Sequence, residues 1–503
     1  MCMKNRVLIR VAETTKVADF ARHLIELGFE ILCSRLNSEL LLNNGVEYTP
    51  VETAMGFATK LGIVTESMQN RIYAGILADR TSPEQIADLK ENHIEPIDIV
   101  CVNVNDYDLK NDVSAISLIK AAVSNVNDVT VVVDFRDYDK ILEEIRTSGE
   151  VSSTTRVSLA VKAMEYIVHK EILHTQMLKR RASTELFPKY LNLTYEKVRN
   201  LKNGENKNQS AAYYKEINNI EPTIPNLKCI KGVDLEFYDI NKINSAIELI
   251  KEFEEIAVVI MGDVLPHGIG TGEDLYEAYI NCIRYEFYSA AGSVAVLNDR
   301  VSRKVALEII KTDLAAVIAP AYDEDALELL MQTENMNIYE ILNESKCVMA
   351  RTIDMKTISG GALVQSVDHK IITKDDIYCV TEKTAEDRQI NDMLLAIRTA
   401  KHLKTSCCVA TKGNQVLGIG SGENNLLVAQ QVAIQGAEGK ILGGVLGFDV
   451  AITSTKIIDA AVSSGIAVII QSGGAENDEE IINYCNENSL IMYFTNSNYN
   501  KMA

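Results

Sequence analysis

Tryptophan is absent from this chain of 503 residues, and aromatic residues make up only 6% of it. Proteins that bind single-stranded nucleic acids stack bases on exposed aromatic rings, so this scarcity argues against such a role. The formal net charge of −20 also repels phosphate backbones. We therefore expect no nucleic-acid partner, although a small anionic ligand can still bind in a pocket that reverses the local sign.

Long apolar runs are also missing. No stretch approaches about 18 consecutive apolar residues, so the sequence predicts no membrane span and no membrane partner. The first residues, MCMKNRVLIRVAE, enter a strand pattern without an apolar leader segment, so no signal peptide is expected.

The ten cysteines follow no metal-binding pattern. They are scattered, and they form neither a CxxC pair nor a Cys/His spacing of the zinc type. The sequence therefore predicts no metal site, and it favours reduced, buried thiols in a cytoplasmic protein.

What is present is the composition of a globular protein, with 47% hydrophobic and 24% charged residues. At roughly 150 residues per domain, the length suggests three folding units. In the first, continuous apolar segments at 7–12, 99–104 and 129–135 alternate with helical patterns. Such strands, separated by helices, are typical of a parallel sheet covered on both faces, so we expect an α/β fold.

A long helical pattern at 154–181 closes this first part, and a polar segment with two prolines follows it. A second α/β module comes after the polar segment, with strands expected at 256–262, 293–297, 315–320, 406–411, 415–420 and 466–471. The predicted boundaries are 1–182 for the first domain, 183–230 for the connecting segment and 231–503 for the second module, which divides into 231–370 and 371–503.

Two glycine-rich segments in the second module echo each other. GIGTGEDL at 268–275 and GIGSGENNL at 418–426 each precede a helical pattern, which hints at an internal duplication. A dinucleotide site needs glycine at the sixth position, where these segments carry Glu273 and Glu423. We interpret both as tight turns without a cofactor.

A histidine near a carboxylate stands at the end of a predicted strand. His267 follows an apolar run and lies close to Asp263 in the sequence. Such a pair can act as an acid and a base, or it can be a loop histidine hydrogen-bonded to its neighbours. Further carboxylates near predicted strand ends are either functional or solvated, namely Glu66, Asp112, Glu286 and Asp449.

Several segments resemble those of one enzyme family in order and spacing. HIEPIDIVCVNV is similar to "gIxPIDLVVVNLYPF", and NGENKNQSAAYY is similar to "RYGENPHQxAAFY". GVDLEFYDINKINSAIELIKEF is similar to "GKxLSYNNIxDxDAALxxVKEF", and SGGALVQ and LGIGSGE are similar to "NGGLLVQ" and "IGIGAGQ". Over nearly its whole length the chain therefore resembles the AICAR transformylase/IMP cyclohydrolase family.

The resemblance implies the fold and the chemistry of that family. Its first module is methylglyoxal-synthase-like, with a parallel sheet, and closes the purine ring. Its second module is a duplicated cytidine-deaminase-like α/β module that transfers a formyl group from formyltetrahydrofolate to AICAR without a catalytic metal. Because the family's transformylase sites lie across a dimer interface, the resemblance also implies a homodimer.

The first module departs from the family pattern at its functional positions. The phosphate-binding loop "STGGT" reads Cys33-Ser34-Arg35-Leu36-Asn37 here, so its backbone anion nest cannot form in the usual way. Arg35 is left as a candidate to contact an anion by charge. The ring-closure lysine falls on Glu66, the tyrosine of "LYPF" on Asn105 and the lysine of "SAAKN" on Ser124, while Asp112 keeps the aspartate of "DIGGP".

The second module departs as well. The Lys-His pair of "KHANPCG" falls on Gly262 and Asp263, and His267 falls on the cysteine of that motif. Asp263 cannot supply positive charge to a developing oxyanion. The family's ligand-holding positions fall on Lys202, Asn203, Tyr238, Asp239, Ser406, Leu426 and Asn477. Asp449 keeps a folate-contacting aspartate, but the aromatic residues beside it are Ala451 and Ile452 here.

Three hypotheses follow. In the one we favour, the chain has lost both activities, is a pseudoenzyme or repurposed relative that needs no cofactor, and binds a purine nucleotide or a folate-like small molecule. In the second, His267, Asp263 and Glu286 carry out altered chemistry, with Asp112 as a further catalytic candidate. In the third, the chain remains a purine-biosynthesis enzyme that uses formyltetrahydrofolate. The lost positive charge is then restored by Lys202, Arg35, Lys404 and Lys412.

Overall fold

The computed structural model describes residues 5–55, 70–104, 113–182, 185–216, 223–263, 265–283, 291–341 and 353–501. The chain forms two compact units, Met1–Thr194 and Tyr195–Ala503. The finer boundaries expected at 182, 230 and 370 remain predictions.

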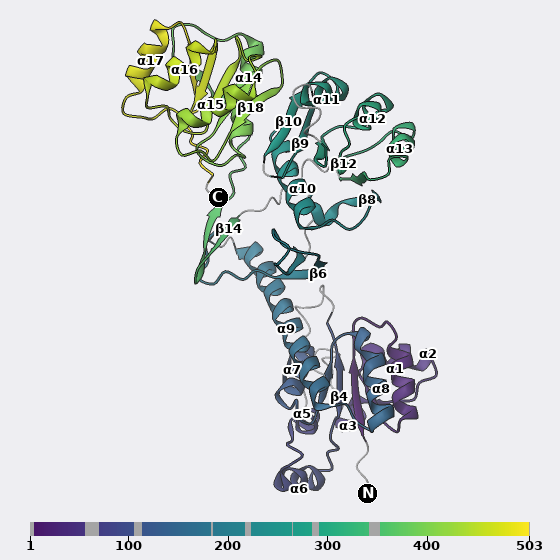
Figure 1. Cartoon of the computed structure of the whole chain (residues 1–503). Helices are drawn as coiled ribbons and strands as arrows, with labels where there is room; N and C mark the ends of the chain where they lie inside the picture. The colour runs from purple at the N-terminus through teal and green to yellow at the C-terminus, as the bar shows by residue number, and fades with distance from the viewer. Residues whose placement is uncertain are drawn as a thin grey trace. The chain divides into compact units, whose positions relative to one another are not determined.

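The first unit is built on a sheet flanked by helices (Figure 1). The strand order of this sheet is β3-β2-β1-β4-β5. Its strands are β1 Arg6–Arg10, β2 Glu30–Cys33, β3 Thr49–Pro50, β4 Ile99–Val102 and β5 Thr130–Val132, and neighbouring strands all pair in parallel. Its helices are α1 Val17–Glu26, α2 Arg35–Asn43, α3 Val51–Met55, α5 Asn70–Leu77, α6 Pro83–Glu91, α7 Val113–Ser124, α8 Tyr138–Ser148 and α9 Ser153–Ala182. The predicted parallel α/β fold is confirmed.

Helices cover both faces of this sheet, which is why most residues within its strands are apolar and buried. On one face α1 and α8 pack together, with the rings of Phe20 and Tyr138 stacked 4.0 Å apart between their centroids. On the other face α7 contacts β4, and α9 contacts β5. The carboxyl ends of all five strands meet at one edge, where ligands bind in folds of this kind.

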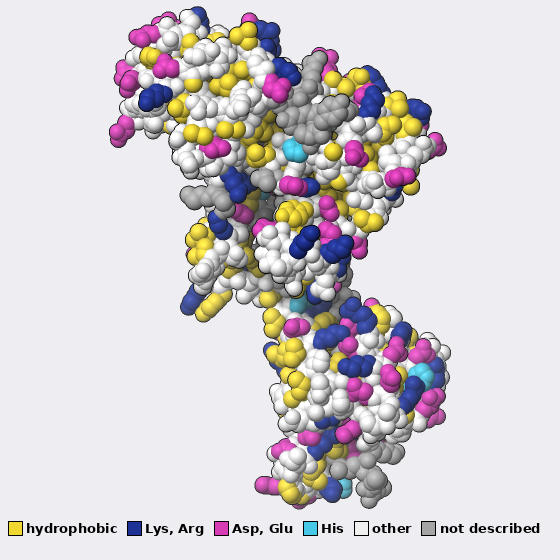
Figure 2. All heavy atoms as spheres, in the orientation of Figure 1, with side chains coloured by type: hydrophobic (Ala, Val, Ile, Leu, Met, Phe, Trp, Pro, Cys, Tyr) yellow, Lys and Arg dark blue, Asp and Glu magenta, His cyan; other side chains and the backbone are white. Residues whose placement is uncertain are grey.

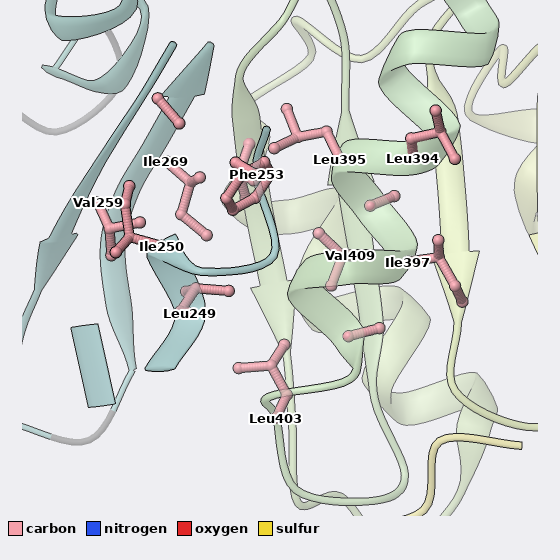
Figure 3. Packing of buried hydrophobic residues seen from close by; sticks show 14 of the residues in the cluster. Leu249, Ile250, Phe253, Val259, Ile269, Leu394, Leu395, Ile397, Leu403 and Val409 are labelled. Atoms are coloured by element: carbon pink, nitrogen blue, oxygen red, sulfur yellow. The ribbon is translucent and has the colours of Figure 1, made fainter. Parts of the chain in front are cut away.

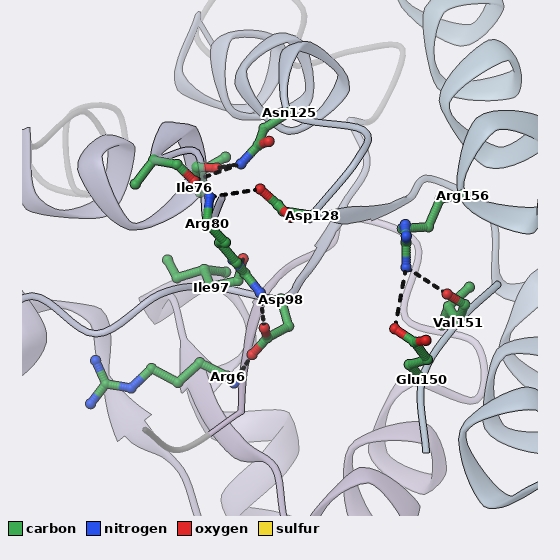
Figure 4. Close-up of polar contacts among 11 residues, drawn as sticks. Arg6, Ile76, Arg80, Ile97, Asp98, Asn125, Asp128, Glu150, Val151 and Arg156 are labelled. Carbon is green, nitrogen blue, oxygen red and sulfur yellow. Dashed lines mark hydrogen bonds and ion pairs between the residues drawn. The ribbon is translucent and has the colours of Figure 1, made fainter. Parts of the chain in front are cut away.

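A polar network fastens the opposite, amino-terminal edge of the sheet (Figure 4). The Arg6 amide donates to Asp98 Oδ2 at 2.6 Å, and the Arg80 guanidinium pairs with the same carboxylate. The Arg80 amide donates to Asp128 Oδ2 at 3.0 Å, and Asn125 Nδ2 donates to the carbonyl of Ile76 at 2.7 Å. These bonds anchor the segment after α5, and they are structural.

The second unit holds two halves with one topology. The first half comprises β8 Lys228–Lys231, α10 Phe237–Ile250, β9 Ala257–Met261, β10 Pro266–Thr271, α11 Leu275–Ile283, β11 Val294–Leu297, α12 Arg303–Ile309, β12 Ala316–Ala319, α13 Glu324–Met331 and β13 Asn337–Glu340. The second comprises β16 Tyr378–Cys379, α14 Asp387–Ala400, β17 Cys408–Thr411, β18 Val416–Gly420, α15 Leu426–Gly436, β19 Val445–Phe448, α16 Thr455–Ser463, β20 Val468–Gln471, α17 Asp478–Glu487 and β21 Ile491–Phe494.

The two mixed sheets match strand for strand. Their orders are β10-β9-β11-β12-β13-β8 and β18-β17-β19-β20-β21-β16. In each, the first hairpin is antiparallel, three later strands run parallel, and the last strand of the order is antiparallel again. The duplicated deaminase-like arrangement is therefore confirmed.

The glycine-rich segments do not have the predicted structure. Gly268, Gly270, Gly418 and Gly420 lie in strands β10 and β18 rather than in turns. A Cβ on Gly270 would stand 2.4 Å from the carbonyl oxygen of Ala278, and one on Gly420 would stand 2.0 Å from that of Ala429. These glycines let each strand approach its following helix, and the sequence pattern alone did not distinguish that use from a turn.

One hydrophobic core joins the two halves (Figure 3). Leu249, Ile250 and Phe253 from the first half pack in the same cluster as Leu394 and Ile397 of α14. Charged residues lie at the same interface. Lys401 Nζ and His402 Nε2 each stand 2.9 Å from Glu252 Oε1, and Arg398 Nη1 is 2.6 Å from Glu255 Oε1.

Two hairpins stand apart from these sheets, β6 Tyr195–Leu201 with β7 Ala211–Glu216, and β14 Ile353–Ile358 with β15 Gly361–Ser366. Almost all of their residues are exposed or half-buried. Among the helices in the described part of the chain, none combines the length and apolar character needed to cross a membrane.

Candidate functional site

The predicted histidine site lies at the corner between β9 and β10. β9 is buried along its whole length and ends at Met261. The chain then turns back in a tight hairpin closed by the Gly262 amide, which donates to the carbonyl of Leu265 at 3.0 Å. The pairing register skips His267, because Pro266 pairs with Met261 and Gly268 pairs with Ile260. His267 is thus the extra residue of a β-bulge, a feature that turns a side chain away from its regular direction.

The bulge directs the His267 imidazole across the corner. Its Nδ1 lies 2.8 Å from the hydroxyl of Ser293, which immediately precedes β11 and is only 1% exposed. Its Nε2 lies over Gly262, so close that a Cβ added to this glycine would stand 2.4 Å from it. Position 262 therefore accommodates no side chain while the imidazole keeps this place.

Asp263 is held by a different partner. Lys242 Nζ of α10 lies 2.6 Å from Asp263 Oδ1 and donates to the carbonyl of Gly292 at 3.2 Å. The Lys242 side chain is 13% exposed and that of Asp263 is 67% exposed. Asp263 therefore faces Lys242, and His267 faces Ser293, so the structure presents two separate polar pairs at one corner.

At the corresponding corner of the second half, the helix residue that contacts the turn is an acidic residue instead of a lysine. Lys412 to Gln415 form the hairpin between β17 and β18, with Gly413 and Asn414 at φ values of 64° and 61°. Two left-handed residues in succession are typical of a type I′ turn. The buried Asp392 carboxylate of α14 accepts the amides of Gly413 and Asn414 at 2.9 and 2.8 Å.

A second polar cluster surrounds Asp449, directly after β19. Asp449 is fully buried, and its Oδ1 accepts the amide of Cys407 at 3.0 Å. Burial raises the pKa of the Asp449 carboxyl, although hydrogen bonds from Cys407 and Thr405 act in the opposite direction. Ser406 precedes Cys407, so two of the predicted ligand-binding residues come together here.

The comparisons with known proteins agree on one family. The family described as "AICARFT/IMPCHase bienzyme" matches residues 122–436. The bifunctional purine biosynthesis protein PurH of Acetivibrio thermocellus is 33% identical over 507 residues, which cover 98% of this chain and 99% of that protein. The PurH proteins of Thermoanaerobacter sp. and Ruminiclostridium cellulolyticum are 33% and 32% identical over 98% of this chain.

This chain belongs to the AICARFT/IMPCHase bienzyme family. The predicted resemblance is confirmed.

Both members of the ion pair between Lys242 and Asp263 differ from the residues of the family motifs. The motif "GKxLSYNNIxDxDAALxxVKEF" has aspartate at the position of Lys242, and "KHANPCG" has histidine at the position of Asp263. Both members of the pair differ, yet the two groups still carry opposite charges and stand in contact. Sequence reasoning missed Lys242 and Ser293, although the Lys242 replacement was visible in the motif comparison.

Most of the predicted ligand-binding side chains have local partners. Asp239 caps α10, since its Oδ2 accepts the Glu236 amide at 3.0 Å, and Glu236 Oε2 accepts the Lys202 amide at 2.9 Å. Lys412 Nζ donates to the carbonyl of Leu442 at 2.7 Å. The structure thus brings Lys202 near the start of α10 with Asp239, and it commits Lys412 to a backbone carbonyl of the second half.

The predicted loop of the first unit is the junction between β2 and α2. Arg35 begins α2 and pairs with Glu52. The Asn37 side chain exchanges two hydrogen bonds of 2.8 Å with the backbone of Val11. Asp112, Glu66, Asn105 and Glu286 lie outside the described residues.

Proposed function

We propose that this chain has lost the two reactions of its family, formyl transfer and ring closure, and that it works by binding a purine nucleotide or folate-like small molecule. The observation that carries the proposal is the corner at Gly262. The His267 imidazole fills the space into which a side chain at 262 would extend, so a lysine there requires the imidazole to move.

The neighbouring positions support the loss of formyl transfer. Asp263 is anionic, and Lys242 neutralises it instead of a substrate group. Removing one donor to an oxyanion costs roughly 10²–10³ in rate, and losing a general acid or base costs about 10²–10⁴. These losses do not add simply, but together they leave little of the reaction.

The folate end of the site is changed as well. Asp449 keeps the family residue, but it is buried and bound to Cys407. The former aromatic position at Ile452 holds a fully buried side chain in the core of the second half, and its amide donates to Gln471 Oε1 at 2.8 Å. The replacements beside Asp449 take away the aromatic side chains of the family pattern, so we propose that the chain does not require formyltetrahydrofolate as a cofactor.

The loss of ring closure rests on replacements in the first unit. Ser124 stands where the family has a lysine, and its hydroxyl donates to the carbonyl of Lys120 in its own helix at 2.9 Å. The remaining replacements, at Glu66 and Asn105, are read from the sequence.

The direct test is turnover by the purified full chain. AICAR with formyltetrahydrofolate tests formyl transfer, and the formylated product tests ring closure, with the Acetivibrio thermocellus PurH protein as the active control. We expect rates at least about 10⁴ below the control. Rates within tenfold of the control would show that the family activities persist and that other lysines or arginines restore the charge.

Binding is tested separately by thermal denaturation with purine nucleotides and folates. A ligand at about 100 times its dissociation constant stabilises the folded state by about 2.7 kcal/mol. A flat response to every compound would contradict the binding role. If His267→Ala removes a newly found activity while leaving ligand affinity intact, altered chemistry at this corner becomes the better account.

We also propose a homodimer in the cytoplasm. The homodimer is expected from the family pattern, and the exposed hairpins β6–β7 and β14–β15 support it, because isolated two-stranded sheets are only marginally stable in water. The cytoplasmic location is supported by the scattered, mostly buried thiols.

A further inference from the structure

Tyr166 of α9 holds the backbone of Val104, just beyond the end of β4. The Tyr166 hydroxyl accepts a hydrogen bond from the Val104 amide at 2.8 Å and donates one to the Val104 carbonyl, also at 2.8 Å. A phenolic hydroxyl can do both at once, because it carries one donor and also acceptor lone pairs. Val104 is only 5% exposed, so its amide and carbonyl would be costly to leave without partners. Tyr166 thus takes the place of a neighbouring strand where the ladder of β4 ends.

Two buried asparagines hold the segment after β1 in the same manner. The Asn37 side chain of α2 binds both the amide and the carbonyl of Val11 at 2.8 Å. Asn103 Oδ1 accepts the amides of Ala12 and Glu13 at 2.7 and 2.9 Å. Because β1 and β4 are paired strands, these two side chains and the tyrosine fix the backbone at one place on the carboxyl edge of the sheet.

The opposite edge of the sheet is fastened by charged groups instead. There Asp98 pairs with the Arg80 guanidinium, and Asp128 accepts the Arg80 amide at 3.0 Å. The three side chains that hold the carboxyl edge are neutral. Since the chain carries a net charge of −20 and repels anions, neutral groups can fix the backbone without adding to that repulsion. The carboxyl edge therefore suits an anionic ligand better than the amino-terminal edge does.

The acidic residues at the carboxyl edge have partners of their own. Asp134, which follows β5, lies 2.8 Å from Lys162 Nζ of α9, and Glu13 accepts the amide and the hydroxyl of Thr15 at 2.9 and 2.5 Å. β1 ends at Arg10, which is 1% exposed and places a positive charge within this edge. On the face drawn in Figure 2, Lys and Arg side chains lie among the Asp and Glu side chains of the first unit. The negative net charge therefore does not gather in one patch on the described part of that face.

We propose that Tyr166 is a positioning residue for ligand binding by the first unit, where its hydroxyl holds the end of β4 in the conformation that a purine nucleotide meets at the carboxyl edge. Tyr166 acts through the backbone of Val104 rather than by touching the ligand. The proposal rests on the proposed binding function, and it names the ligand class and the edge of the sheet that binds it. A site with a fixed backbone binds more tightly, because no ordering of that backbone is needed on binding.

The first experiment measures the hydrogen bonds of Tyr166 without any ligand. Tyr166→Phe in the full chain removes the hydroxyl and keeps the ring, so we expect amide hydrogen exchange at Val104 to become at least about tenfold faster. Tyr138→Phe is the matched control, because it removes a hydroxyl that lies 3.2 Å from Cys101 Sγ within β4. This control should leave exchange at Val104 unchanged. Equal exchange rates at Val104 in Tyr166→Phe and the wild type would overturn the proposal.

The second experiment separates positioning from a purely structural role by titration calorimetry of the full chain with IMP and AMP. We expect Tyr166→Phe to raise the Kd at least about tenfold and Tyr138→Phe to change it less than about twofold, even where both variants lose stability. A nucleotide that binds the wild type and Tyr166→Phe equally well would overturn the proposal. If the wild type binds neither nucleotide but binds a folate, this role fails while the proposed binding function stands. If it binds no compound of either class, both fail.

Discussion

The two halves of the second unit share one topology, yet they hold the same hairpin corner with opposite charges. In the second half, the buried Asp392 of α14 accepts two turn amides. In the first half, the sixth residue of the equivalent helix is Lys242, which pairs with the turn carboxylate of Asp263. In both halves, a side chain from the sixth residue of the helix therefore holds the hairpin turn. The two halves make this contact with residues of opposite charge.

The two halves also share some features of their first hairpin and differ in others. The close glycine contacts of β10 and β18 recur in both halves, because the strand-to-helix distance is part of the fold. The bulge also recurs, but its residue is the buried Leu417 in one half and His267 in the other. The half that carries His267 is the one in which the family's Lys-His pair has been replaced.

The largest effect is expected from the charge cluster that joins the halves. Glu252 and Lys401 are both 8% exposed, and removing one partner of a buried ion pair costs about 3 kcal/mol or more. We expect Glu252→Gln to lower the free energy of unfolding by about 3 kcal/mol in urea denaturation. Glu248→Gln, which breaks an exposed pair with Lys251, should cost less than about 1 kcal/mol.

The pH dependence sharpens this prediction. Burial raises the pKa of the Glu252 carboxyl, but the hydrogen bond and charge of His402 and the ammonium of Lys401 outweigh it, so the net pKa lies below the ordinary value of 4.5. A lowered folded-state pKa means that the stabilisation is complete above pH 4.5 and is lost as the pH falls through the folded-state pKa. The difference between wild type and Glu252→Gln should therefore shrink below pH 4.5, and a constant difference would contradict this assignment.

An intermediate effect is expected at the altered corner. Gly262→Ala introduces a Cβ against the His267 ring and should cost about 2 kcal/mol. In a His267→Ala background the same substitution should cost less than about 0.5 kcal/mol, which gives a coupling energy of about 1.5 kcal/mol between these touching residues. Gly361→Ala, at an open position of β15, is the control and should be nearly neutral. Additive effects would mean that the imidazole does not occupy this place.

The smallest effects are expected from replacing the helix residue that contacts each hairpin turn, Asp392 in one half and Lys242 in the other. Asp392→Asn should cost about 1–2 kcal/mol, because the amides of Gly413 and Asn414 lose the charged acceptor that the buried Asp392 side chain supplies. Lys242→Met should cost less than about 1 kcal/mol, since Asp263 is largely exposed and remains solvated. Chemical denaturation of both variants checks the order, and a greater loss in Lys242→Met would break the comparison.

Much of the fold could be predicted from residue patterns. The helical pattern at 154–181 corresponds to α9, Ser153–Ala182, and the apolar runs at 256–262 and 315–320 correspond to β9 and β12. These elements are buried on one or both faces, so the spacing of their apolar residues follows the period of the helix or strand that they form. The run at 129–135 was less informative, because only Thr130–Val132 pairs as a strand before the chain enters a short helical turn at Phe135.

The candidate site could be predicted only in part. The motif comparison located the corner at 262–267 and its replaced residues. It did not reveal that His267 would bond to Ser293 or that Asp263 would bond to Lys242, since each pair joins segments about twenty or more residues apart in sequence.

By itself, the sequence determined the family, the alternation of strands and helices, and the identity of the replaced groups. Each of these follows from the spacing of apolar residues or from the order of motifs, and neither depends on which distant residues are in contact. Only the tertiary structure decided which replaced groups meet. A β-bulge at His267 turned the imidazole over Gly262, and the packing of α10 beside the hairpin brought Lys242 to Asp263. Those contacts depend on the approach of distant segments in three dimensions, which no local pattern encodes.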